Sequence, residues 1–176
     1  MLVPGSTTTK RRVLIVAYDD VQILDIACAS GVLYIASPCP VRSRRTPSSW
    51  GVSAVRAARS SAGLVVGAGQ GLETVAGRLD TLIVVSGIGC EGAAADERHL
   101  GQVHRLAGLS RRVASVCTGA HVLAAAGLLD HRRVTTHWGW RDRLAERHPD
   151  VAVDANPFTY VTAMSTPRPE SPARST

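Results

Sequence analysis

Short, continuously apolar runs alternate along the chain with longer segments whose apolar positions recur at helical spacing. A continuous apolar run of strand length is typical of a parallel strand that is covered on both faces. Strands that alternate with helices predict an α/β fold, a parallel sheet with helices on both faces. The predicted strands are 12–17, 64–66, 81–85, 112–116, 133–136 and 151–153, and the predicted helices are 21–35, 91–108, 118–129 and 138–147.

Three segments show neither periodicity. Residues 1–10 read as a flexible leader. Residues 37–60 are rich in Pro, Ser and Arg and hold no strand where the alternation calls for one, and residues 156–176 turn to Pro, Ser, Thr and Arg just after a strand begins. Such compositions favour a loop or a tail. The pattern therefore predicts one folded unit over 11–155 with an irregular stretch at 37–60.

Length and composition fit a single domain with a substantial core. The 176 residues are 45% hydrophobic and 19% charged, which is typical of a globular chain. No apolar run approaches the ~18–20 residues that span a bilayer, and the run at 13–17 is too short for a signal-peptide core. We therefore expect a cytoplasmic protein that has no membrane partner.

The net charge of +6 does not indicate a nucleic-acid surface. Five arginines and no acidic residue lie within 37–60, so most of the excess charge comes from one irregular segment and not from a folded face. We expect no direct nucleic-acid binding by this chain. The four cysteines stand singly and the histidines lack ligand spacing, which argues against a zinc ribbon, a disulfide scaffold and a metal site. No cofactor is predicted.

The strongest chemical signal is the segment Ser115-Val-Cys-Thr-Gly119. A predicted strand runs directly into Cys117 and a predicted helix begins at the next residue, which is the arrangement of a nucleophile elbow. The first turn of that helix would place backbone N–H groups and a positive partial charge beside the sulfur and so favour a thiolate. The alternative is a structural cysteine, because free cysteines are often buried.

Two further signals point to the same edge of the sheet. Gly87, which with Gly89 follows the strand at 81–85, is a candidate oxyanion donor through its N–H, with the N–H of Thr118 as the second donor; the alternative is a plain turn. Asp25 follows the first strand near the start of a helix, where it could reach the crevice at the carboxyl ends of the strands. The alternative for Asp25 is a solvated acid.

Weaker candidates follow the elbow. His121 lies four residues after Cys117, within reach of the thiol or of the core, and a structural role is favoured. His137 and Trp138 end a predicted strand and are candidates for lining the mouth of the pocket.

Three consecutive blocks resemble the ThiJ/PfpI superfamily, and most closely the class I glutamine-amidotransferase-like N-terminal domain of AraC-type transcriptional regulators. Isonitrile hydratases share these blocks. The resemblance covers 11–36 and 61–155 and rests on Val113-Ala-Ser-Val-Cys-Thr-Gly-Ala120, Leu123-Ala-Ala-Ala-Gly-Leu-Leu-Asp130 and Arg132-Arg-Val-Thr-Thr-His-Trp138.

The resemblance implies a flavodoxin-like three-layer sandwich, usually dimeric, with a reactive cysteine at the elbow. By position, it makes Cys117 the reactive cysteine, Thr118 its neighbour, Gly87 the oxyanion glycine and Asp25 the acid. Two turns depart from the family pattern: Cys28-Ala29 replaces a Gly-Pro pair, and Val85-Ser86-Gly87 replaces Pro-Gly-Gly. Both turns aim the site, so their change argues against intact catalysis.

The carboxyl-terminal region departs from the family as well. We expect a C-terminally truncated fold without the DNA-binding domain of the regulators. The residues from Thr162 to Pro172 match a family strand segment read one nucleotide late, and Ser48-Ser-Trp50 gives a weaker hint of the same kind. We hypothesise a frameshift near 157–161. Because apolar faces would lose their cover, we expect poor solubility or a non-native oligomer.

Three hypotheses about function remain open. The first is a ligand-sensing regulatory domain that binds an unknown small-molecule effector and forms a homodimer if it is stably folded. The second is an isonitrile-hydratase-like lyase or hydrolase, in which Cys117 attacks carbon, Asp25 transfers protons, and the N–H groups of Gly87 and Thr118 steady the developing charge. The third is a frameshifted product without function. The altered turns and the regulator-like block ending at Trp138 favour the first hypothesis.

Overall fold

The apolar run Val13–Ala17 forms β1, which lies inside the main sheet because all five of its residues are buried. A computed structural model describes residues 11–36, 51–54, 58–67, 69–154 and 161–165 of the chain. Strand β1 pairs in parallel with β5 (Leu79–Val84) on one side and with β2 (Gly51–Ala54) on the other. A strand with apolar residues on both faces fits this central place.

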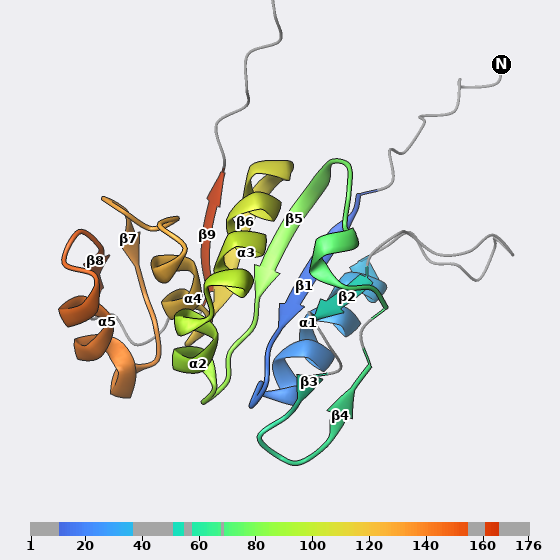
Figure 1. Ribbon diagram of the computed structural model, residues 1–176, viewed down its shortest axis with the longest axis horizontal. Helices are drawn as coiled ribbons and strands as arrows, with labels where there is room; N and C mark the ends of the chain where they lie inside the picture. The colour runs from blue at the N-terminus through green and yellow to red at the C-terminus, as the bar shows by residue number, and fades with distance from the viewer. Residues whose placement is uncertain (1–10, 37–50, 55–57, 68, 155–160, 166–176) are drawn as a thin grey trace, which may run out of the picture.

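The described strands of the main sheet follow the order β2-β1-β5-β6-β9 (Figure 1). Strand β6 (Ser110–Val116) continues the parallel arrangement beside β5, and β9 (Val161–Ser165) closes the edge antiparallel to β6. The parallel α/β sheet expected from the sequence is confirmed for β1, β5 and β6. The antiparallel edge makes the sheet mixed.

Two segments expected to be irregular supply edge strands. Residues 37–60 contain β2 and also β3 (Ala58–Arg59), and residues 156–176 contain β9. Backbone hydrogen bonding to a formed neighbour strand recruits such edges, even where the segment has little strand periodicity of its own. The frameshift hypothesis stays a prediction. The expected leader, 1–10, lies outside the described residues, as do 37–50 and most of the tail.

Helices cover the sheet on two sides, each with its own core. Leu14 and Val16 of β1 join the larger core, which packs against α2 (Cys90–Ala95), α3 (Glu97–Leu109) and α4 (Gly119–Ala125). Ile15 and Ala17 face the opposite core, which includes Ile26 of α1 (Ile23–Ala36). The alternation of side chains along one strand therefore builds the two outer layers of the expected three-layer sandwich.

The segment 91–108, predicted as one helix, forms two. Asp96 separates α2 from α3, and its carboxylate accepts hydrogen bonds from the N–H groups of Arg98 and His99 at 2.9 and 3.1 Å. An Asp that caps a helix N-terminus ends the preceding helix. The segment 118–129 also ends early, with α4 stopping at Ala125 before Gly127, whose φ is +68°.

Two small pairs of strands lie outside the main sheet at opposite ends of the molecule: β3 with β4 (Val65–Val66), and β7 (Arg133–Val134) with β8 (Ala152–Val153) (Figure 1). The predicted strands at 133–136 and 151–153 form the second of these pairs. The predicted helix at 138–147 is split between a 3-10 turn, η3 (Trp138–Trp140), and α5 (Arg141–Arg147). The last short element, η2 (Leu72–Thr74), lies beside α3, where Arg105 donates a hydrogen bond to the Leu72 carbonyl at 2.7 Å.

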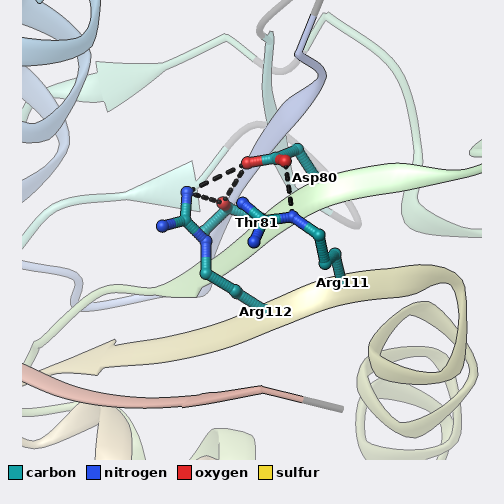
Figure 2. Close-up of polar contacts among 4 residues, drawn as sticks. All are labelled: Asp80, Thr81, Arg111 and Arg112. Atoms are coloured by element: carbon teal, nitrogen blue, oxygen red, sulfur yellow. Dashed lines mark hydrogen bonds and ion pairs between the residues drawn. The ribbon is translucent and has the colours of Figure 1, made fainter. Parts of the chain in front are cut away.

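An ion cluster ties β5 to β6 where these strands begin (Figure 2). Asp80 accepts hydrogen bonds from Arg111 at 2.8 Å, from Arg112 at 3.0 Å and from the Thr81 hydroxyl at 2.9 Å. The Arg111 bond is the main cause that lowers the pKa of Asp80 to about 2. The cluster lies at the opposite end of the sheet from Cys117, so it supports the scaffold and not the site.

Across the described part of the chain, no helix has the length and apolar character needed to cross a membrane.

Candidate functional site

The parallel strands β1, β5 and β6 all have their carboxyl ends at the same end of the sheet, here called the carboxyl edge. Cys117 lies there, directly after β6. Its φ is +51°, a left-handed conformation that is uncommon for a residue with a side chain and typical of a nucleophile elbow. Helix α4 begins two residues later at Gly119, where a Cβ atom would collide with the Val84 carbonyl of β5. The chain therefore turns from strand to helix in the tight manner that the sequence predicts.

A hydroxyl clamp fixes the turn that follows β5. The Thr118 Oγ1 atom accepts a hydrogen bond from the Gly87 N–H at 3.0 Å and donates one to the Gly87 carbonyl, also at 3.0 Å. Thr118 is buried. The Gly87 N–H therefore has a partner within the protein, and its role as an oxyanion donor stays a prediction that requires the Thr118 hydroxyl to release it.

Close backbone approach explains the glycines at 87 and 89. A Cβ atom on Gly87 would lie 2.6 Å from the Val21 Cα and would also collide with the Asp20 carbonyl, and one on Gly89 would collide with the Asp19 carbonyl. Val21 and Gly87 form a bridge between the two turns. The glycines therefore serve the contact between the ends of β1 and β5.

Asp25 reaches the site from the first turn of α1. Its Oδ2 atom accepts two hydrogen bonds from Ser86, one from the N–H at 3.2 Å and a short one from the hydroxyl. Asp25 is half-buried, whereas Ser86 is 7% exposed. The carboxylate therefore shares the edge of the sheet with Cys117, on the side of the turn after β5.

Burial raises the pKa of the Cys117 thiol, and the charge of Asp25 raises it further. The N–H groups of Thr118 and His137 and the Ser86 hydroxyl oppose this effect by favouring the thiolate, but they do not reverse it. Burial and the nearby carboxylate therefore favour the neutral form of this half-buried thiol, and the thiolate expected from the sequence stays a prediction.

Two further buried groups near the elbow, the Tyr18 phenol and the Cys90 thiol, also have raised pKa values. The Tyr18 hydroxyl, at the end of β1, donates to the Val85 carbonyl at 2.9 Å, and burial raises the pKa of this phenol. Burial also raises the pKa of Cys90, whose thiol contacts the Thr118 hydroxyl. Sequence reasoning missed Tyr18 and the contacts of Ser86. Their positions directly after the first and second buried strands were the available signal.

The connection after β7 closes the side of the elbow. The Thr136 hydroxyl donates to the Cys117 carbonyl at 3.0 Å, and the next residue, His137, acts on the thiol through its backbone N–H. The His137 ring accepts the Gly139 N–H at 3.1 Å and lies against Trp138, with ring centroids 5.2 Å apart. Trp138 is 72% exposed. The structure thus brings His137 to the thiol and places Trp138 on the surface beside it.

His121 belongs to the packing between α4 and α5. The residue is 2% exposed, and its ring meets Trp140 edge-on with centroids 5.6 Å apart. Burial, reinforced by the charge of His148, lowers its pKa to about 4. The main groups that act on the Cys117 thiol are instead Asp25, Ser86 and the N–H groups of Thr118 and His137. This arrangement fits the structural role favoured for it.

Metal-ligand clusters are not found among the described residues: no three His, Cys, Asp or Glu side chains gather in a way that could hold an ion. The chemistry available at this edge is that of a neutral thiol, a carboxylate and the hydroxyls of Ser86 and Thr118. Such a set can bind a small polar molecule, and it can attack an electrophilic carbon when a base takes the thiol proton.

Comparison with known proteins gives one family match over most of the chain. The model of the DJ-1/PfpI family matches residues 11–167. A Streptomyces lividans protein described as "Uncharacterized protein in cpoL 5'region" is 38% identical over 143 residues, which cover 81% of this chain and 99% of that protein.

Two relatives with described activities match over shorter segments. The isonitrile hydratase of Pseudomonas putida is 46% identical over 66 residues, 38% of this chain and 29% of the enzyme. The HTH-type transcriptional regulator GbdR of Pseudomonas aeruginosa is 35% identical over 81 residues, 46% of this chain and 22% of the regulator. The match therefore spans less than a third of either relative.

Solved structures share the fold. A ThiJ/PfpI family protein from Pseudomonas syringae superimposes with a TM-score of 0.68 at 24% identity, over 88% of this chain and 64% of that one. An AraC family transcriptional regulator from Pseudomonas putida gives a TM-score of 0.61 at 21% identity, over 85% of this chain and 78% of that one.

Proposed function

The chain belongs to the DJ-1/PfpI family, and we propose that it is a ligand-sensing regulatory domain resembling the N-terminal half of AraC-type regulators. Its effector is a small molecule that binds at the edge of the sheet between Asp25 and Cys117. The observation that carries this proposal is the engagement of the Gly87 N–H by Thr118, at 3.0 Å. A site whose expected oxyanion donor is occupied is better suited to binding than to acyl or hydration chemistry.

The protonation state of the thiol supports the same reading. Because burial raises the pKa of Cys117, the stronger nucleophile, the thiolate, is scarce near neutral pH. Asp25 and the half-buried thiol remain as polar groups that can orient a ligand. The matched regulators are also transcription factors by description, although the chain covers less than a third of their length.

A specific observation favours the alternative, an isonitrile-hydratase-like enzyme. The segment matched to that enzyme is 46% identical, and Asp25 lies close enough to influence the Cys117 thiol. In this alternative Cys117 attacks the isonitrile carbon, Asp25 moves protons, and the N–H of Thr118 steadies the charge, joined by the Gly87 N–H once the Thr118 hydroxyl releases it. Addition of one water to the isonitrile then gives the N-substituted formamide.

One experiment separates the two functions. The purified chain is screened by thermal shift against small amines, carboxylates and amides, and it is assayed separately for formamide release from a simple alkyl isonitrile. The sensor proposal expects a saturable shift that Asp25→Asn abolishes and Cys28→Ser, an exposed thiol on α1, leaves intact. Turnover of the isonitrile that Cys117→Ser abolishes would refute the sensor and establish the enzyme.

The proposal includes a homodimer. Leu24, Val32 and Ile35 of α1 are 63%, 66% and 81% exposed, and apolar area of this kind on a helix favours association. Light scattering on the purified chain is expected to give the mass of two copies. A mass of one copy with a cooperative melt would contradict both the dimer and the poor solubility expected from the sequence.

A further inference from the structure

We propose that the amino edge of the main sheet, where β1, β5 and β6 begin, binds the phosphate backbone of a nucleic-acid duplex without reading its sequence. This edge lies at the opposite end of the sheet from Cys117, so the proposal goes beyond the effector site and does not depend on it. The surface consists of the arginines that precede or open the three strands: Arg11, Arg12, Arg78, Arg111 and Arg112.

Strand pairing brings these arginines together from three distant parts of the chain. The Arg12 carbonyl accepts the Asp80 N–H at 2.8 Å, which sets the start of β1 beside that of β5. The Arg12 guanidinium donates to the Ala76 carbonyl at 2.7 Å, on the turn that leads to Arg78. On its other side β5 pairs in parallel with β6. Because adjacent strands lie about 4.8 Å apart, the three starting points span only about 10 Å.

The acid inside this cluster is already shared between two arginines. Asp80 accepts from Arg111 through Oδ1 at 2.8 Å and from Arg112 through Oδ2 at 3.0 Å (Figure 2). Even so, the side chains of these two arginines remain 45% and 42% exposed. Arg11 and Arg78 are exposed, and neither side chain has a hydrogen bond or ion pair among the described residues. Four guanidinium groups can therefore reach a ligand outside the protein.

The folded chain thus carries a second concentration of positive charge besides residues 37–60. The segments that border the amino edge, 11–13, 72–80 and 109–112, hold five arginines and two acids, Glu73 and Asp80, a net charge of +3. The expectation of no nucleic-acid contact assumed that the excess charge lies outside any folded face. Here the charge lies on paired strands, which is the arrangement that a nucleic-acid surface requires.

The lack of apolar groups at this edge favours a phosphate backbone over other anionic partners. The strongly exposed large apolar side chains of the described residues lie on α1, beside β4 and at the carboxyl edge, and the three bordering segments hold no aromatic residue. A protein partner buries an apolar centre, a membrane takes up apolar side chains beside basic ones, and single strands stack on aromatic rings. Duplex phosphates need only cations and donors, and guanidinium groups bind them in a bidentate way.

The test measures the fluorescence anisotropy of a short labelled DNA duplex that is titrated with the purified chain at several salt concentrations. If each of the four exposed arginines neutralises one phosphate, the logarithm of the association constant should fall against the logarithm of the salt concentration with a slope of about −3 to −4. The dissociation constant at physiological salt should be about 10⁻⁴–10⁻⁶ M, as for other non-specific binding. A second duplex of different sequence should bind equally well.

The edge variant combines Arg11→Gln with Arg78→Gln, because these side chains make no contact that the fold would lose. Its melting temperature should stay at the wild-type value, and its salt slope should become shallower by about 2. The matched control combines Arg98→Gln with Arg132→Gln. Both are exposed, have no side-chain partner among the described residues, and lie at the start of α3 and just before β7. The control removes the same charge and should keep the wild-type slope.

The proposal is overturned if the wild-type chain does not bind the duplex at low salt, a result that needs no variant. It is also overturned if the control loses as much slope as the edge variant, which would show an effect of net charge alone. An edge variant that binds like the wild type would assign the binding to the arginines of 37–60 instead. Polyglutamate and vesicles that contain phosphatidylglycerol are the competing anions, and tighter binding to either of them at the same salt would overturn the choice of partner.

Discussion

Replacing Thr118 by valine removes one hydroxyl and keeps the branched shape of the side chain. The hydroxyl makes two hydrogen bonds with Gly87, both 3.0 Å long, and it is 5% exposed as part of a buried threonine. In Thr118→Val the Gly87 N–H and carbonyl lose these partners in a place that water reaches poorly. A buried polar group without a partner costs about 1–3 kcal/mol.

The expected loss follows from these two groups. If each is left partly unsatisfied, the free energy of unfolding falls by about 2–4 kcal/mol, a large fraction of the ~5–15 kcal/mol typical of a domain. The turn after β5 would also loosen, because the bonds to Thr118 hold Gly87 against the elbow. Cys117 should then become more accessible, and its alkylation at constant pH should be faster in Thr118→Val than in the wild type.

Urea unfolding followed by circular dichroism measures the first effect. The matched control is Thr74→Val, since the Thr74 hydroxyl also donates to a backbone carbonyl, that of Gly71 at 2.8 Å, but in an exposed turn. Water replaces that bond, so the control should lose less than about 1 kcal/mol. Equal losses in the two variants, or no loss in Thr118→Val, would show that the hydroxyl does not clamp the turn.

Two further predictions concern pH. Burial lowers the pKa of His121 from 6.5 to about 4, so as the pH falls the unfolded chain takes up a proton on this residue before the folded chain does. The free energy of unfolding should therefore fall by about 2–3 kcal/mol between pH 6.5 and pH 4. In His121→Phe, urea unfolding should show a weaker dependence on pH over this range. The bond from Arg111 is the main cause that lowers the pKa of Asp80 from 3.8 to about 2. At pH 7, Asp80→Asn should therefore lower the free energy of unfolding by about 1–2 kcal/mol, a figure reduced for the exposure of Arg111 and Arg112. The difference between wild type and variant should disappear as the pH falls from 3.8 to 2. Asp142→Asn removes an acid that is 83% exposed in its ion pair with Arg141 and should cost close to nothing. An equal cost in both variants would contradict the role of the cluster.

The strands that sequence patterns predict best are those that the fold buries on both faces. The runs at 12–17, 81–85 and 112–116 became β1, β5 and β6, because a strand covered on both faces carries apolar residues at most positions instead of at every second one. The edge strands β2 and β9 lack such a run, and backbone pairing with β1 and β6 places them. Their formation depends on a neighbour that is distant in sequence, so a local pattern does not predict them.

The candidate site, too, has a local part that the sequence predicts and a part made by residues distant in sequence that it does not. Cys117 and the turn into α4 are local, and the sequence places them well. The bonds from Ser86 to Asp25 join residues 61 apart in the chain, and the Thr118 clamp joins residues 31 apart. No periodicity or spacing encodes these contacts. They exist because the carboxyl ends of adjacent parallel strands meet at one edge.

Those distant contacts decide which chemistry the elbow can perform. Taken alone, the strand–Cys–helix segment suggests a thiolate steadied by free N–H donors. Burial of Cys117 and the nearby charge of Asp25 raise the pKa of the thiol and so favour its neutral form, and the Thr118 hydroxyl occupies the Gly87 donor. A nucleophile in this setting lacks ready-made charge stabilisation, so any reaction must begin with removal of its proton by a base. Asp25 is the carboxylate whose charge acts on Cys117, so the acid on α1, and not only the helix after the elbow, belongs to the environment that sets the reactivity of this thiol.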